Sequence, residues 1–145
     1  MSLYYIGMVA AIAFPALGSA IGAGLASQAA VGGWKKCFRE NKSAPFILSA
    51  FAGAPLTQTI YGFLLSGFIQ GSASAQNNPL FGMLAGILAG LAIGASALYQ
   101  GKVAAGAADS LAETGKGTAN YFIVIGIVET VALFTLIFTM LVLNR

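Results

Sequence analysis

One acidic side chain stands out because of the residues around it. Glu129 lies within residues 117–144, a mostly apolar run that contains no other charged residue. A charged carboxylate inside a bilayer costs at least ~3 kcal/mol, so such groups are usually functional or paired. Lys102 is the nearest cation in the preceding apolar run, and we expect it toward the end of that run. Glu129 is therefore a candidate transport residue, and the alternative is a protonated carboxyl group that only links two helices.

Three polar side chains in an earlier apolar run could complete a site around that carboxylate. Tyr61 lies four residues after Thr57 and three after Gln58, so all three side chains share one side of a helix. Pro55 cannot donate a backbone hydrogen bond and crowds the preceding turn. We therefore expect it to free a carbonyl group for coordination, such as that of Ala54.

Gln100 offers a further amide oxygen, although its depth fits less well. It lies about 20 residues, or ~30 Å, from the start of its expected helix, whereas Glu129 lies about 14 residues from the end of its own. The two residues align only if the helix of Gln100 begins well outside the hydrocarbon or is shifted along its axis.

The chemistry that these residues suggest is the carriage of a monovalent cation. A Na+ ion must replace its hydration shell with several oxygens, and a carboxylate cancels its charge. The predicted ligands are Glu129, Gln100, Gln58, Thr57 and the backbone carbonyl of Ala54, with Tyr61 as a hydrogen-bond partner of the carboxylate. A proton carrier would need little more than the carboxyl group, so H+ is the alternative cargo. A loaded site would be neutral and could face lipid, whereas an empty one would have to lie beside a fixed cation of a neighbouring subunit.

Composition identifies the medium in which this site would work. Of the 145 residues, 58% are hydrophobic and only 8% are charged, whereas soluble domains carry about 25% charged residues. The length suits four spanning helices with short connections. We therefore expect an all-α membrane protein with four transmembrane helices, at about residues 3–31, 45–69, 80–108 and 119–143.

Other kinds of chemistry are excluded by what the sequence lacks. Cys37 is the only cysteine and there is no histidine, so neither an intrachain disulfide nor a usual transition-metal site can form. Gly101 and Lys102 are followed by Val103 and not by Ser or Thr, so there is no phosphate-binding loop. No basic stripe suits nucleic acid. We expect no catalytic activity from this chain alone and no bound nucleotide.

The positions of the cations predict how the chain crosses the membrane. Residues 1–34 and 43–101 contain no charged side chain, and four of the seven cations (Lys35, Lys36, Arg39 and Lys42) lie between these two runs. Because cytoplasmic loops carry an excess of Lys and Arg, we expect loops 33–44 and 109–118 in the cytoplasm. Both termini would then lie outside.

The two halves of the chain resemble each other. A shift of 72 residues aligns residues 18–23 with 90–95, Gln28 with Gln100, and Thr57 with Glu129. The sequence thus predicts a parallel repeat of two helical hairpins, residues 1–72 and 73–145, with the carboxylate in the second. Chance similarity between two helices rich in Gly and Ala is the alternative.

Small residues recur at every fourth position in the first and third expected helices. These residues are Gly18, Gly22, Ala26 and Ala30, and then Gly82, Gly86, Gly90 and Gly94. Such stripes let helix backbones approach closely in lipid. The second and fourth helices carry bulky aromatic residues instead. A ring of hairpins with the small-residue helices inside fits this pattern, and a plain four-helix bundle fits it equally well.

The motifs resemble those of the proteolipid (K or c) subunit of bacterial V-type ATPases. The resemblance covers nearly the whole chain and is carried by the double hairpin with one carboxylate and by three segments, 54–63 (APLTQTIYGF), 100–106 (QGKVAAG) and 128–130 (VET). It implies Na+ binding at Thr57, Gln58, Gln100, Glu129 and the Ala54 carbonyl, with Tyr61 stabilising the glutamate. Residue 54 is usually bulkier in that family, but only its carbonyl is implicated.

The same resemblance implies partners and a location. It implies a homo-oligomeric rotor ring in the bacterial plasma membrane, surrounded by lipid, beside a stator subunit with a cation and above cytoplasmic central-stalk subunits. A proton-translocating ring is the first alternative. A small four-helix drug antiporter is the second, and it is disfavoured because the only tryptophan, Trp34, lies in a loop. A structural four-helix protein would leave Glu129 unexplained.

Overall fold

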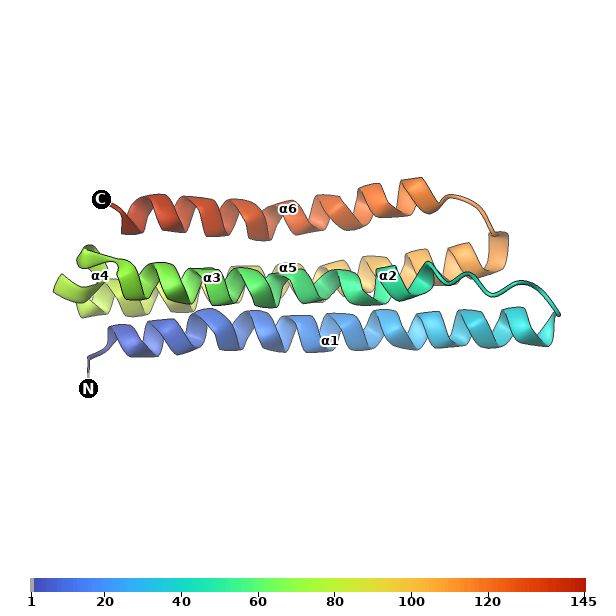
Figure 1. Cartoon of the computed structure of the whole chain (residues 1–145), viewed down its shortest axis with the longest axis horizontal. Helices are drawn as coiled ribbons and strands as arrows, with labels where there is room; N and C mark the ends of the chain where they lie inside the picture. Colours follow the sequence, from blue (N-terminus) through green and yellow to red (C-terminus); the bar gives the residue numbers. More distant parts are fainter. Residues whose placement is uncertain (1) are drawn as a thin grey trace.

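Long helices run side by side along the whole length of the computed structural model, which describes residues 2–145 (Figure 1). The described elements are α1 (Tyr4–Arg39), α2 (Leu48–Gly53), the 3-10 turn η1 (Ala54–Leu56), α3 (Thr57–Gly71), α4 (Ala73–Asn77), α5 (Pro79–Thr114) and α6 (Thr118–Leu143). Helices α2 and α3 continue one line through η1 and lie beside α1 (Figure 1). The described residues thus form an all-helical bundle.

Within the described residues, three helices are long and apolar enough to cross a membrane, namely α1, α5 and α6. Each of α1 and α5 has 36 residues, which gives a length of ~54 Å against a hydrocarbon thickness of ~30 Å. These two helices therefore extend well beyond the hydrocarbon. The rod at residues 48–71 is divided by η1, and its longest helix has only 15 residues.

The ends of α1 and α5 differ from those expected. Helix α1 does not stop at Gly32 and Gly33 but continues to Arg39. A methyl group on Gly33 would lie only 2.7 Å from the Cβ of Ala112, so this glycine permits close packing on α5 and does not end the helix. Helix α5 continues to Thr114 and ends at Gly115, which has the left-handed backbone conformation that favours glycine (φ 65°). The expected loops 33–44 and 109–118 are therefore largely helical.

The second rod also departs from the expected continuous helix at 45–69. It begins at Leu48, and the carbonyl of Pro45 accepts a hydrogen bond from the indole nitrogen of Trp34 at 2.8 Å. The 3-10 turn at Pro55 interrupts it, because proline has no N–H to continue the α-helical pattern. The expected turn at 70–79 contains the short helix α4. The start and end of α6 agree with the prediction to within one residue.

The contact between α1 and α5 is made through glycine. A methyl group on Gly18 would collide with the backbone of Gly94, one on Gly86 with the backbone of Gly7, and one on Gly101 with the backbone of Gly22. No larger residue fits at these points, since the opposing atoms are backbone and cannot rotate away. The remaining small residues of the predicted stripes are also buried, namely Gly22, Ala26, Ala30, Gly82 and Gly90.

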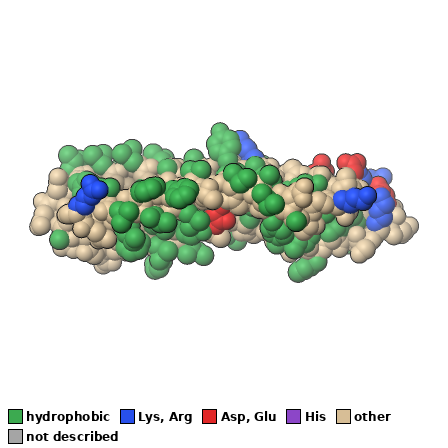
Figure 2. Space-filling view, turned by 90° about the horizontal axis from the view of Figure 1, so that it is seen from above, with side chains coloured by type: hydrophobic (Ala, Val, Ile, Leu, Met, Phe, Trp, Pro, Cys, Tyr) green, Lys and Arg blue, Asp and Glu red, His purple; other side chains and the backbone are tan. Residues whose placement is uncertain are grey.

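Both termini lie at one end of the bundle, near α4, and the connections after α1 and α5 lie at the other (Figure 1). At the first end, the Ser72 hydroxyl donates to the carbonyl of Leu143 at 2.7 Å. At the second, Lys36 and Glu113 form an exposed ion pair of 2.8 Å. Figure 2 shows hydrophobic side chains along the length of the molecule, with most of the charged side chains toward one end and a few near the middle and the other end. This pattern suits a molecule whose long sides face lipid.

Candidate functional site

The carboxylate of Glu129 is held from two neighbouring helices. The hydroxyl of Tyr61 in α3 donates to its Oε1 at 2.7 Å, and the amide nitrogen of Gln100 in α5 donates to its Oε2 at 3.3 Å. Glu129 itself lies in α6 and is only partly buried. The carboxylate therefore joins α3, α5 and α6, with one donor on each oxygen.

Behind the carboxylate lie two fully buried amides. Gln58 and Gln100 each have an exposure of 0%, and the Nε2 of Gln58 donates to the Oε1 of Gln100 at 2.8 Å. A buried amide without hydrogen-bond partners would destabilise the fold. This bond satisfies the NH2 group of Gln58 and the oxygen of Gln100. The amides thus extend the hydrogen-bonded chain from Glu129 across α5 to α3.

Three oxygens gather at the start of α3. The hydroxyl of Thr57 lies 3.0 Å from the carbonyl oxygen of Ala54 and 3.1 Å from the Oε1 of Gln58. The Ala54 carbonyl also accepts the backbone N–H of Thr57, so it is not left free as the sequence suggested. One hydroxyl proton cannot serve both acceptors at full strength, and the cluster is richer in oxygen lone pairs than in donors.

The 3-10 turn explains why these oxygens converge. An α-helix would direct the Ala54 carbonyl to the N–H of Gln58, but the tighter turn directs it to Thr57. The carbonyl and the Thr57 side chain therefore lie together. Pro55, which is buried, supplies the break.

The structure also removes the difficulty with the depth of Gln100. Helix α5 begins at Pro79, 21 residues before Gln100, whereas α6 ends at Leu143, 14 residues after Glu129. The two side chains are nevertheless hydrogen-bonded, so α5 begins beyond the level at which α6 ends. Lys102 is only two residues beyond Gln100, or ~3 Å along the axis, and so lies nearer to the site in depth than expected. Its side chain is exposed and lies over the ring of Tyr99 at 4.9 Å. Among residues 2–145, it makes no ion pair with Glu129.

Ser96 is a member of this network that the sequence analysis missed. It is buried, with an exposure of 4%. Its hydroxyl lies 2.8 Å from the carbonyl oxygen of Val128 and 3.4 Å from the Nε2 of Gln58. Its position in the sequence could have indicated this role, because Ser96 lies four residues before Gln100 and therefore on the same side of α5.

One family comparison bears on this arrangement. Residues 83–142 match the family model for the C subunit of ATP synthase. The match covers most of α5 and α6, with Ser96, Gln100 and Glu129, and it leaves the first half of the chain outside. Members of this family are membrane proteolipids that translocate ions in a multi-copy ring, and the long apolar helices α5 and α6 agree with a place in a membrane. No curated protein matches the chain.

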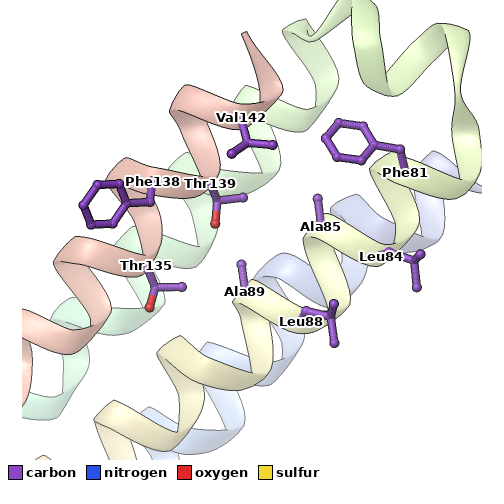
Figure 3. Close-up of a pocket in the computed structure, with 9 residues that line it drawn as sticks. All are labelled: Phe81, Leu84, Ala85, Leu88, Ala89, Thr135, Phe138, Thr139 and Val142. Carbon is purple, nitrogen blue, oxygen red and sulfur yellow. The ribbon is translucent and has the colours of Figure 1, made fainter. Parts of the chain in front are cut away.

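A groove between α5 and α6 has a different character from the site. It has a volume of about 520 Å³ and lies toward the end of the bundle that holds the termini. Figure 3 shows that apolar side chains of both helices line it, Phe81 and Leu88 among them, with the hydroxyls of Thr135 and Thr139. It lacks a charged group, so it is no candidate for the cation.

No cluster of three or more His, Cys, Asp or Glu residues occurs in the described part of the chain. The site consists instead of one carboxylate with neutral amide, hydroxyl and carbonyl oxygens. Such a set suits a hard cation of low charge and not a transition metal.

Proposed function

We propose that the chain is the ion-carrying rotor subunit of a rotary V-type ATPase and that it carries Na+ on Glu129. The observation that carries this proposal is the cluster of oxygens beside the carboxylate. The hydroxyl oxygen of Thr57 lies 3.0 Å from the carbonyl oxygen of Ala54 and 3.1 Å from the Oε1 of Gln58, and the buried amide of Gln100 connects Gln58 to Glu129. A proton carrier has no use for this many oxygens.

The ion would bind through five residues. The ligands in this proposal are the carboxylate of Glu129, the side-chain oxygens of Gln100, Gln58 and Thr57, and the carbonyl of Ala54. Tyr61 would keep its hydrogen bond to Glu129 and hold the carboxylate in place. The hydroxyl proton of Thr57 can turn away from one acceptor, which gives the cation access to the lone pairs.

The bound ion would make rotation through lipid possible. Na+ and the ionised Glu129 together are neutral, whereas an unpaired carboxylate at this depth carries the membrane penalty. We propose that the segmented rod at residues 48–71 is the fourth span, so that two hairpins, residues 1–72 and 73–145, contribute one site. Identical copies would form the ring, and the ion would be released beside a cation of the stator subunit.

The orientation in this proposal follows from the charges. The end of the bundle with Lys35, Lys36, Arg39 and Lys42 would lie in the cytoplasm of the bacterial cell and contact the central stalk, and both termini would lie outside. ATP would be hydrolysed by other subunits.

A hydrophobic carbodiimide tests the proposal, because it modifies a protonated carboxyl group in a membrane. Labelling of Glu129 in the purified ring at neutral pH should be suppressed by NaCl and not by KCl. Gln58→Ala and Gln100→Ala should each raise the Na+ concentration needed for protection. Equal labelling with and without Na+ would contradict the sodium assignment and favour the proton-translocating ring.

A further inference from the structure

Ser96 is buried among the groups of the proposed site but supplies no proposed ligand. Its partner in α6 is the carbonyl of Val128, the residue before Glu129, at 2.8 Å. A carbonyl oxygen can only accept a hydrogen bond. The single proton of the Ser96 hydroxyl is therefore committed to Val128, and its lone pairs remain for another partner.

That second partner is the side chain of Gln58. The Ser96 oxygen can accept but not donate toward it, so the amide must turn its NH2 group to Ser96, at the long separation of 3.4 Å. The same NH2 group donates to Gln100 at 2.8 Å. With both N–H bonds on this side, the Oε1 of Gln58 must face the opposite way, toward Thr57.

The orientation of Gln100 is set in the same manner. Its NH2 group donates to the carbonyl of Ile125 at 3.1 Å and to Glu129. Two backbone carbonyls of α6 thus orient two side chains of α5: the carbonyl of Val128 accepts from Ser96, and that of Ile125 accepts from Gln100. Together they determine which atom each buried amide presents to its neighbour.

We propose that Ser96 is a positioning residue for cation binding: it holds the Gln58 amide so that its oxygen, and not its NH2 group, faces the ion. This inference rests on the proposed function. A reversed amide would direct two partly positive hydrogens at a cation and would leave the oxygen of Gln58 facing the oxygen of Gln100. Removal of the Ser96 hydroxyl allows that reversal, and only Gln100 then opposes it.

The test compares the Na+ concentration that half-protects Glu129 from carbodiimide in the purified wild-type ring and in Ser96→Ala. One net hydrogen bond corresponds to a rise of roughly three- to tenfold. The rate of labelling without Na+ is measured in both rings, so that a change in the reactivity of Glu129 itself is distinguished from a change in Na+ affinity. Ser19→Ala is the matched control, because Ser19 is also buried and its hydroxyl has no hydrogen-bond partner among residues 2–145. It should leave the half-protecting concentration unchanged.

A double substitution shows whether Ser96 acts through Gln58. In a Gln58→Ala ring, the further change Ser96→Ala should alter the half-protecting concentration by less than twofold. A full, independent effect in that background would overturn the proposal, and so would wild-type Na+ protection in Ser96→Ala alone. If the alanine variant does not assemble, Ser96→Cys, which is similar in size but a weak donor, should show the same rise. Absence of Na+ protection in wild type would instead refute the proposed function, and the role of Ser96 with it.

Discussion

The amide nitrogen of Gln100 lies 3.3 Å from a carboxylate oxygen of Glu129, although the two residues are 29 positions apart and belong to different helices. The same nitrogen lies 3.1 Å from the carbonyl oxygen of Ile125, one turn before Glu129 in α6. Gln100 therefore fixes both the carboxylate and the backbone that carries it. Because the amide of Gln100 is fully buried and bonds to both groups of α6, it holds α5 and α6 in one register at the site.

Tyr61→Phe should weaken Na+ binding without preventing assembly. The substitution removes the 2.7 Å hydrogen bond to Glu129 and keeps the ring of the side chain. A hydrogen bond to a charged group is worth ~1.5–3 kcal/mol, so the Na+ concentration for half-protection should rise about tenfold or more. The exposed Tyr99 is the control, and Tyr99→Phe should bind Na+ as wild type does. An unchanged affinity in Tyr61→Phe would show that the hydroxyl does not hold the carboxylate in the loaded ring.

Pro55→Ala should weaken Na+ binding by changing the backbone. Alanine restores an N–H, so η1 can become ordinary α-helix and the Ala54 carbonyl can turn to the N–H of Gln58. The loss of one ligand should raise the half-protecting concentration about tenfold. Pro79→Ala is the control, since Pro79 occupies the first turn of α5 and lies away from the site. Equal Na+ affinity in Pro55→Ala and wild type would remove the Ala54 carbonyl from the ligand set.

Gly101→Ala should destabilise the fold, whereas Gly106→Ala in the same helix should not. A methyl group on Gly101 would collide with the backbone of Gly22, but one on Gly106 would meet nothing within 4 Å. Forced overpacking costs ~1–3 kcal/mol, while alanine in an open helical position gains up to ~1 kcal/mol over glycine. Thermal unfolding in detergent measures both changes. Similar melting of the two variants would mean that α1 and α5 can separate without loss of stability.

Much of the fold could be predicted from hydrophobicity and charge. The apolar runs predicted the long helices. The start of α6 was predicted to within one residue, because Gly117 and the polar residues before it separate its apolar run from the preceding one. The ends of α1 and α5 could not be found in this way. Gly33 and Asp109 look like signals for a loop, but here a glycine permits helix packing and the helices project beyond the hydrocarbon, where charge costs little.

The candidate site was predicted where side chains of unusual type occur in an apolar run. Glu129, Gln58 and Gln100 are such residues, and the structure brings them into one hydrogen-bonded network. Ser96 was missed because serine is common in membrane helices and its role depends on a carbonyl in another helix. The hydrogen bonds of the Ala54 carbonyl were also beyond prediction, since they depend on whether the turn at Pro55 is α or 3-10.

The most direct test of the sodium assignment is equilibrium binding of radioactive Na+ to the purified ring, with the ring of Glu129→Gln beside it. Glutamine has nearly the same shape as glutamate but cannot cancel the charge of the ion. The account predicts saturable binding of one Na+ for each wild-type chain, no competition by K+, and no binding to Glu129→Gln. No saturable binding to the wild-type ring, or equal binding to both rings, would contradict it.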